Sequence, residues 1–198
     1  HIESDKIKTM IKNRFCPTND FKIISDLDVI IICVPTPLDN KKEPDLSFII
    51  DTIDAIKKHL KKNQLLILES TSYPGTTEEK IIPMINNIVF TDQYNSDDEQ
   101  LNVGKNFFVG YSPERIDPGN DNFTIKTIPK IVSGYSLICS ELINLLYSQI
   151  VVQTIPVSSM KVAEMTKILE NIFRAVNIGL VNELKMVADK LGIDIFEV

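Results

Sequence analysis

Apolar residues in this chain fall into short continuous runs that alternate with segments of helical period. Residues 28–34 (DVIIICV), 65–70 (LLILES) and 105–111 (KNFFVGY) are largely apolar with little polar alternation. Such runs are typical of parallel strands that are covered on both faces. Two shorter apolar runs, at 130–135 and 151–155, predict further strands of the same sheet.

The segments between these runs predict helices. Apolar residues recur at helical spacing in 46–60 and in 137–150. A further helix is expected to begin near Gly75, with Thr76 or Thr77 as its N-cap and glutamates in its first turn. The repeated β-α-β-α order implies an α/β fold with a right-handed, mostly parallel sheet.

The last part of the chain predicts one long helix. Residues 158–192 contain no proline and keep a helical apolar period, and Gly192 stands where a C-terminal cap is expected. Two helices with a break near Gly179 are the alternative. A helix of this length suggests an element that links two domains or forms a dimer seam. We therefore divide the chain into an α/β domain at 1–157 and a central helical region at 158–198.

Composition and charge exclude several classes of protein. With 43% hydrophobic and 24% charged residues, the 198-residue chain is typical of a globular protein. A net charge of −6 argues against nucleic-acid or membrane-surface binding, which requires a basic patch. No apolar run reaches the roughly 18 residues of a membrane span, and we expect no signal peptide. Anionic small ligands are still compatible with this charge, because loop amides and helix N-termini bind phosphate locally.

The three cysteines, Cys16, Cys33 and Cys139, are far apart in the sequence. Their number and spacing fit neither a disulfide framework nor a zinc site, so we predict no metal. Cys33 lies in an apolar strand and Cys139 in an amphipathic helix, and both are expected to be small core residues. Unpaired thiols indicate a reducing compartment, and we expect a cytoplasmic protein.

Three turns rich in proline follow predicted strands: VPTPL at 34–38, ESTSYPGTT at 69–77 and YSPERIDPGN at 111–120. In open α/β sheets, ligands bind beyond the carboxyl ends of the strands. Taken singly, Thr36 or Thr71 is a hydroxyl that stabilises a turn, and 111–120 is a polar surface turn. Because all three turns belong to one edge of the sheet, we expect them to form a ligand site together.

The long helix carries a polar stripe. Glu164, Lys167, Asn171 and Arg174 are spaced by 3, 4 and 3 positions, so they share one helix face. One interpretation is a solvated face. The other is that Lys167, by its charge, and Asn171, by a directed amide hydrogen bond, jointly stabilise an oxyanion.

Four stretches of the sequence form a recognisable set. CVPTPL (33–38), ESTSYPGTTEE (69–79), SPERIDPGN (112–120) and AEMTKILENIFRAVNIGLVNEL (163–184) resemble, in order, motifs of the UDP-glucose/GDP-mannose dehydrogenase family. The form SPER-x-DPGN, together with ESTxYPGTTE, is most similar to the branch that oxidises UDP-N-acetylglucosamine or UDP-N-acetylmannosamine. This resemblance implies a Rossmann-like NAD-binding domain followed by the long central helix.

The resemblance also implies an activity. Members of the family oxidise the C6 alcohol of a nucleotide sugar to a carboxylate, using two NAD⁺ in succession through a cysteine thiohemiacetal and thioester. The chain is thus expected to be part of an NAD-dependent UDP-N-acetyl-hexosamine 6-dehydrogenase that serves polysaccharide biosynthesis. The expected partners are a UDP-sugar and a second copy of the chain, paired through the long helix.

The family motifs imply a cofactor side of the site. Val34, Pro35 and Thr36 match the strand-end segment that borders the dinucleotide. Ser70 and Thr71 match the next turn on the cofactor side, and Thr71 matches the threonine placed near the nicotinamide and the catalytic water. These five residues are therefore the expected NAD contacts, with Thr71 also catalytic.

The same motifs imply a substrate side. Glu114 matches the glutamate that follows the loop proline and helps handle the catalytic water, and Arg115 and Ile116 match the sugar-facing part of that loop. Lys167 and Asn171 match the pair that stabilises the oxyanion, in agreement with their spacing on the helix. Glu114, Lys167 and Asn171 are thus expected to be both catalytic and substrate-binding.

Some family features are absent from the 198 residues. No G-x-G-x-x-G turn with an acidic residue about 20 positions later is present, and no cysteine has a G-x-C-x-x-x-D context. We therefore expect a fragment that begins after the first βαβ unit, lacks the C-terminal nucleotide-sugar domain and is inactive alone. Pro118 stands where UDP-glucose-specific relatives carry a second glutamate, which leaves the general base open and Asp117 as a weak substitute.

Two alternatives stay open. A UDP-glucose or GDP-mannose 6-dehydrogenase would share the same chemistry and differ in the sugar-facing loop around Arg115 and Ile116. A non-catalytic dimerisation or regulatory module could also be built on the same fold.

Overall fold

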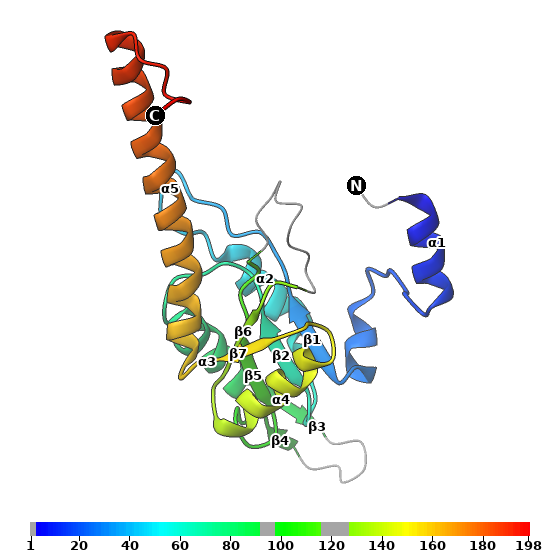
Figure 1. Ribbon diagram of the computed structural model, residues 1–198. Coiled ribbons are helices and arrows are strands. Elements are labelled where there is room, and N and C mark those ends of the chain that lie inside the picture. Colours follow the sequence, from blue (N-terminus) through cyan, green and yellow to red (C-terminus); the bar gives the residue numbers. More distant parts are fainter. Residues whose placement is uncertain (1–2, 92–97, 116–126) are drawn as a thin grey trace.

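The predicted strands assemble into one mostly parallel sheet. The computed structural model describes residues 3–91, 98–115 and 127–198 (Figure 1). The strands of the sheet are β1 (Val29–Ile32), β2 (Leu65–Leu68), β5 (Phe108–Tyr111), β6 (Lys130–Gly134) and β7 (Thr154–Pro156); β3 (Val89–Thr91) and β4 (Asp98–Gln100) form a separate antiparallel pair. Their order is β1-β2-β5-β6-β7, and among these described strands β6 is antiparallel to β5 while the other neighbours are parallel. The predicted α/β fold is therefore confirmed.

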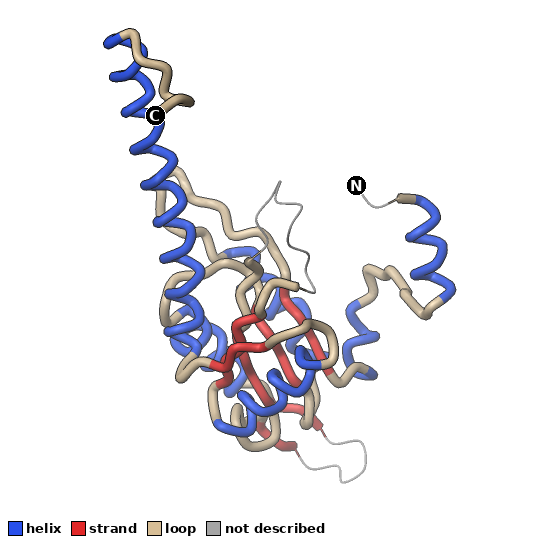
Figure 2. Tube along the Cα trace, in the orientation of Figure 1, coloured by secondary structure: helices blue, strands red, loops and turns tan. Residues whose placement is uncertain are grey.

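Helices cover both faces of the sheet (Figure 2). The helices are α1 (Ser4–Lys12), α2 (Ser47–Ile56), α3 (Ile82–Asn86), α4 (Leu137–Ser148) and α5 (Met160–Leu191), with 3₁₀ turns at Phe21–Asp26 and Lys57–His59 and a π-helical turn at Thr77–Ile81. On one face α2, α3 and the start of α5 pack on the larger apolar core, and on the other face α4 packs on β2 and β6. α1 stands apart from the sheet, and all of its residues are exposed.

Strand β2, which lies inside the sheet between β1 and β5, shows why a continuous apolar run is required. All four of its residues are buried, and successive side chains point to opposite faces. Leu66 and Leu68 belong to the core beneath α2 and α3, whereas Leu65 and Ile67 belong to the core beneath α4. A strand with helices on both faces cannot alternate apolar and polar residues.

The prediction that residues 28–34 are covered on both faces is wrong. Ile30 and Ile32 are buried against α2, but the side chain of Ile31 is 44% exposed. Cys33, predicted to be a core residue, is exposed as well, whereas Cys139 is buried as predicted. The reason is the position of β1 at the edge of the described sheet, whereas α4 packs mainly on β6 and also contacts β2, β5 and β7.

Close backbone contact fixes α4 on the sheet. A Cβ atom at Gly134, the last residue of β6, would lie 2.2 Å from the backbone nitrogen of Ser140 in α4. A Cβ at Gly110 in β5 would likewise lie 2.8 Å from Ile143 Cδ1. These two glycines let α4 approach the sheet more closely than any other residue type would allow.

The long helix is continuous. α5 covers 32 residues through Gly179, and Gly192 caps it with φ of 68° in the left-handed region, as predicted. The Ser159 hydroxyl accepts a hydrogen bond from the Val162 N–H at the other end. Beyond its first turns the helix leaves the sheet and projects away from the body of the molecule (Figure 1). Among the described helices, none combines the length and apolarity that a membrane span needs.

Candidate active site

Three loops meet at one edge of the sheet. β1, β2 and β5 are adjacent and parallel, with Ile32 paired to Leu68 and Leu68 paired to Tyr111, so their carboxyl ends lie side by side. The turns that follow these strands therefore converge, as the sequence predicted. This edge is where open α/β sheets bind their ligands.

Ser70 joins the first two loops. Its hydroxyl accepts a hydrogen bond from the Val34 N–H at 2.8 Å and donates one to the Val34 carbonyl at 2.8 Å. The predicted cofactor contacts Pro35 and Thr71 are exposed beside this link, and Thr36 is half-buried. Ser70 is itself buried, so its hydroxyl orders the two turns, and the exposed Pro35 and Thr71 are the side chains free to contact a ligand.

A partly buried polar cluster lies beneath these loops. Glu69, at the end of β2, accepts hydrogen bonds from the Cys33 thiol at 3.4 Å and from the Tyr147 hydroxyl of α4. Lys130 of β6 places its Nζ 2.9 Å from Glu69 Oε1 and 5.1 Å from the centre of the Tyr147 ring. Burial and the neighbouring Glu69 carboxylate raise the pKa of Cys33 to about 11, and they raise the pKa of Tyr147 further still. Both groups therefore stay protonated near neutral pH.

Lys130 connects this cluster to Glu114. The Nζ of Lys130 lies 3.6 Å from Glu114 Oε2, while Glu114 Oε1 accepts a hydrogen bond from the Arg115 N–H at 2.7 Å. Lys130 is nearly buried, and the Glu114 side chain is 46% exposed. Both oxygens of Glu114 thus contact protein groups, while the side chain as a whole stays nearly half exposed at this edge of the sheet.

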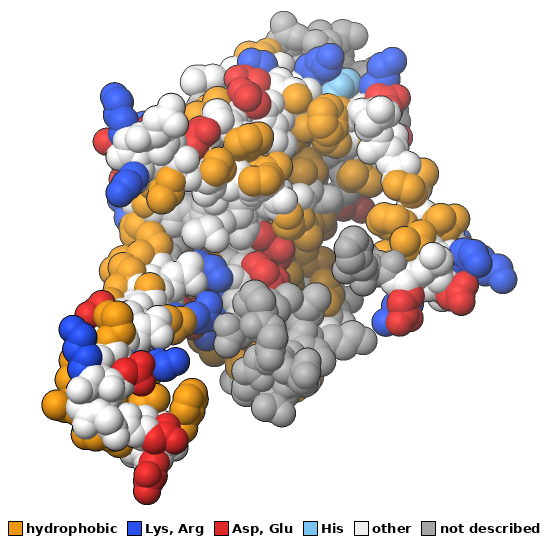
Figure 3. All heavy atoms as spheres, turned by 90° about the horizontal axis from the view of Figure 1, so that it is seen from above, with side chains coloured by type: hydrophobic (Ala, Val, Ile, Leu, Met, Phe, Trp, Pro, Cys, Tyr) orange, Lys and Arg blue, Asp and Glu red, His pale blue; other side chains and the backbone are white. Residues whose placement is uncertain are grey.

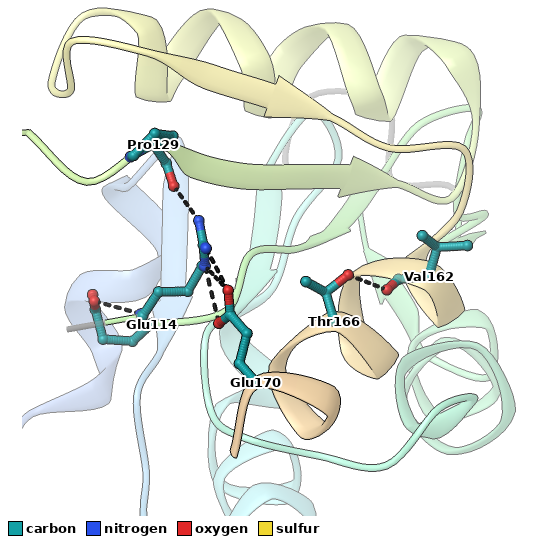
Figure 4. A network of polar contacts seen from close by, with 6 residues as sticks. Glu114, Pro129, Val162, Thr166 and Glu170 are labelled. Atoms are coloured by element: carbon teal, nitrogen blue, oxygen red, sulfur yellow. Dashed lines mark hydrogen bonds and ion pairs between the residues drawn. The ribbon is translucent and has the colours of Figure 1, made fainter. Parts of the chain in front are cut away.

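Arg115 ties the third loop to α5 (Figure 4). Its Nε donates to the two carboxylate oxygens of Glu170 at 2.9 and 3.1 Å, and a second guanidinium nitrogen also contacts Glu170. The remaining arm donates to the Pro129 carbonyl at 2.9 Å. A bidentate pair of this kind fixes both partners. Arg115 was predicted to contact substrate, and in this structure its guanidinium anchors the loop that carries Glu114.

Lys167 lies close to this anchored loop. Burial lowers the pKa of Lys167; the Glu170 and Glu114 carboxylates oppose that shift, while the cations Arg174 and Arg115 add to it. Lys167 also stands three positions before Glu170, which contacts the Arg115 guanidinium, so the predicted oxyanion lysine lies about one helix turn from the anchor of the loop that carries Glu114. Asn171, one turn further along α5, is exposed. Ile116, with Asp117 and Pro118, lies outside the described residues.

Glu164 departs from the predicted stripe. It is fully buried, so the solvated interpretation of this face is wrong at that position. Its Oε2 accepts from the Gly75 N–H at 2.6 Å, and its Oε1 accepts from the Thr77 N–H at 3.0 Å and the Thr77 hydroxyl at 2.7 Å. Thr76 is the N-cap residue by position, as predicted, but its hydroxyl does not cap the helix and donates instead to the Tyr73 carbonyl at 2.7 Å. The carboxylate of α5 caps this helix start instead, because an anion complements the helix N-terminus better than a hydroxyl does.

Sequence reasoning therefore found the loops and missed their partners. Glu69 stood in a quoted motif directly after β2, which was a usable signal. Lys130 and Tyr147 gave none, because their contacts with Glu69 cross 61 and 78 positions of sequence. Among the described residues, no cluster of three His, Cys, Asp or Glu side chains could hold a metal ion.

Comparison with known proteins decides the family. The model of the NAD binding domain of the UDP-glucose/GDP-mannose dehydrogenase family matches residues 2–151, and the model of the family's central domain matches 161–198. The chain belongs to this family. The predicted family and the NAD cofactor are thereby confirmed.

Individual relatives agree with this assignment. Protein CapL of Staphylococcus aureus is 42% identical over 91% of this chain, and a UDP-N-acetyl-D-glucosamine 6-dehydrogenase of Pseudomonas aeruginosa is 39% identical over 98%. These matches cover 41% and 44% of the two relatives, respectively. The solved structure of a UDP-D-ManNAc dehydrogenase from Pyrococcus horikoshii aligns with all of the chain and 46% of its own, with a TM-score of 0.84 and 30% identity. The chain thus spans under half the length of these relatives.

The site residues fit a dinucleotide. Exposed Pro35 and Thr71 and half-buried Thr36 lie at the carboxyl ends of parallel strands, where NAD binds in such sheets. At this edge Lys130, Lys167 and Arg115 supply positive charge, and Glu69, Glu114 and Glu170 supply negative charge. The arrangement can therefore hold a nicotinamide beside an anionic reacting centre.

Proposed function

We propose that this chain forms part of an NAD-dependent nucleotide-sugar 6-dehydrogenase that oxidises the C6 alcohol of a UDP-N-acetyl-hexosamine to a uronate. The main support is the convergence of the cofactor-side turn at Thr71 with Glu114 and Lys167 at one edge of the sheet. The names of the relatives point to the same substrate class, since they include UDP-N-acetyl-D-glucosamine and UDP-N-acetyl-D-mannosamine dehydrogenases. We further propose that the enzyme serves polysaccharide biosynthesis and that it works in the cytoplasm.

Each residue has a proposed role in this reaction. NAD, when bound, accepts the hydride from C6. Pro35, Thr36 and Thr71 would border the nicotinamide side, and the half-exposed Glu114 would hold or deprotonate the water. Lys167 and Asn171 would stabilise the oxyanion from α5. Because Lys167 is partly desolvated, its charge acts on an oxyanion more strongly than it would in water.

A panel of sugar nucleotides tests the substrate class. The complete enzyme that carries this chain is expected to form NADH with UDP-N-acetylglucosamine or UDP-N-acetylmannosamine and at least about tenfold more slowly with UDP-glucose or GDP-mannose. Faster turnover of either of the latter would reassign the substrate. The 198-residue chain alone is expected to form no NADH, since its sequence contains neither the glycine-rich turn nor the nucleophilic cysteine motif.

We also propose that α5 pairs with α5 of a second copy. After its first turns the helix exposes a series of large apolar side chains: Leu169, Phe173, Val176, Leu180, Leu184 and Leu191. They recur at intervals of three, four or seven positions, the spacing of a helix packing seam. Figure 3 shows hydrophobic side chains along this helix where it stands clear of the body.

A further inference from the structure

Glu164 has no part in the roles proposed above, although it is the most completely buried carboxylate of α5. Four donors converge on its two oxygens: the N–H groups of Gly75 and Thr77, the Thr77 hydroxyl, and the Ser72 hydroxyl at 3.4 Å. Burying an ionised carboxylate is costly unless its donors remain in place. The contact therefore restrains the turn and the helix relative to each other.

The two segments joined by Glu164 carry opposite sides of the proposed site. Ser72 directly follows Thr71, the exposed threonine on the cofactor side. On the other segment, Lys167 stands three positions after Glu164. Figure 1 shows the lower end of α5 lying beside α3, where this contact forms.

We propose that Glu164 is a positioning residue for the dehydrogenase reaction. Its carboxylate holds the 71–77 turn against α5, so that Thr71 on the cofactor side and Lys167 on the substrate side keep a fixed separation. Hydride transfer depends on such placement, because small displacements of reacting groups cost large factors in rate. This inference rests on the proposed function, and it adds a residue that touches neither cofactor nor sugar.

The Glu164→Gln variant tests the hydrogen bonds of the two carboxylate oxygens separately. In Glu164→Gln the amide oxygen can still accept from the Thr77 N–H and hydroxyl. The amide NH₂ must then face the Gly75 N–H, and two donors cannot bond to each other. Glu164→Gln is therefore expected to release Gly75 and keep Thr77, whereas Glu164→Ala releases both.

Hydrogen exchange of the backbone amides measures this contact independently of enzyme activity. In the complete enzyme, Glu164→Ala is expected to lower the protection of the Gly75 and Thr77 amides at least about tenfold, as the loss of a charged acceptor implies. Glu164→Gln should lower protection at Gly75 alone. The matched control is Lys161→Ala, which removes an exposed contact between α5 and Glu79 on the same segment and should change neither amide.

Kinetics then distinguish positioning from mere support of the fold. A variant that only loses folded enzyme has a lower kcat at unchanged KM. Displacement of the 71–77 turn is expected instead to raise the KM for NAD about fivefold or more while the KM for the UDP-sugar stays within about twofold. Glu164→Gln should fall between wild type and Glu164→Ala, and Lys161→Ala should match wild type.

Each outcome decides the proposal. If the wild type turns over sugar nucleotides and Glu164→Gln retains both the wild-type KM for NAD and the wild-type Gly75 protection, the positioning role is refuted. If Glu164→Ala does not fold, the Glu164→Gln variant still decides it. A wild-type enzyme that binds NAD but oxidises no sugar nucleotide would contradict the proposed function, and the binding constant for NAD of Glu164→Gln, expected about fivefold weaker, would still report the position of the turn.

Discussion

At the scale of single residues, the site is organised by partners that lie far apart in sequence. Glu69 gathers Cys33, Lys130 and Tyr147 from three other elements around one carboxylate. Lys130 then reaches Glu114. The proposed catalytic carboxylate is therefore positioned partly by Lys130, which was not among the predicted site residues, and partly by Arg115, which was.

The chemistry of Cys33 follows from this cluster. Burial and Glu69 raise its pKa to about 11 from 9.0, which makes its thiolate fraction at pH 8 roughly a hundredfold smaller than that of an ordinary thiol. Cys16 and Cys33 are both exposed, but iodoacetamide is expected to label Cys33 far more slowly because its thiol is hydrogen-bonded to Glu69, with mass spectrometry of the two peptides as the measurement. Glu69→Gln should accelerate labelling at Cys33. Equal rates at Cys16 and Cys33 in the wild type would contradict the proposed hydrogen bond.

Lys130 is expected to stabilise the folded state through its ion pair with Glu69. Lys130→Met leaves the partly buried Glu69 without its cation and is expected to lower the free energy of unfolding by about 3 kcal/mol in urea denaturation. Lys57→Met is the matched control, because the Lys57 to Asp54 pair is about half exposed and contributes roughly 0.5 kcal/mol or less. Similar losses in both variants would mean that the cluster around Glu69 does not stabilise the fold.

The limits of sequence reasoning are clear at this scale. The placement of Thr71 and Glu114 at one edge of the sheet could be predicted because each stands in a turn directly after a predicted strand. Glu164 could not, since helical spacing places it on a face but cannot say that the 72–77 turn covers that face. Burial depends on the tertiary neighbour, and no local pattern encodes that neighbour.

At the scale of elements, hydrophobic patterning predicted the strands of the main sheet and its longer helices. It did not predict α1 or the β3–β4 pair, and it missed the direction of β6 and the start of β7. β6 runs antiparallel to β5, although both are short apolar runs of the same kind. The run at 151–155 proved to be a turn that packs Val151 against α4, followed by β7 at Thr154–Pro156. Apolar residues report that a segment is buried, but they do not report its direction or its pairing.

Close packing between β6 and α4 gives a prediction at this scale. Gly134→Ala would force the backbone of Ser140 and Cys139 to move, and is expected to cost about 2–3 kcal/mol of unfolding free energy. On α5, Gly179→Ala meets nothing within 4 Å in the described part of the chain. It should stabilise by about 0.5–1 kcal/mol through helix propensity. Thermal unfolding is expected to show lower stability for Gly134→Ala and higher stability for Gly179→Ala. A Gly134→Ala variant with unchanged stability would refute the close approach of α4.

At the scale of the whole molecule, the projecting α5 exposes large apolar side chains, and we propose that a second copy of the chain covers them. Val176→Asp combined with Leu180→Asp places two charges in the proposed seam and is expected to convert a dimer to a monomer at micromolar concentration in analytical ultracentrifugation. Leu137→Asp on α4 changes a still more exposed leucine outside α5 and should leave the assembly unchanged. A wild type that is monomeric throughout would contradict pairing through α5.

The central claim is that the cofactor-side turn, the Glu114 loop and α5 form one oxidoreductase site in which Lys167 stabilises the oxyanion. The most direct measurement is the rate of NADH formation by the complete enzyme with a saturating UDP-N-acetyl-hexosamine. Lys167→Ala is expected to lower kcat about a hundredfold or more, while Lys161→Ala, two turns earlier on the same helix, should stay within about twofold of wild type. A Lys167→Ala enzyme that keeps the wild-type kcat would contradict the account.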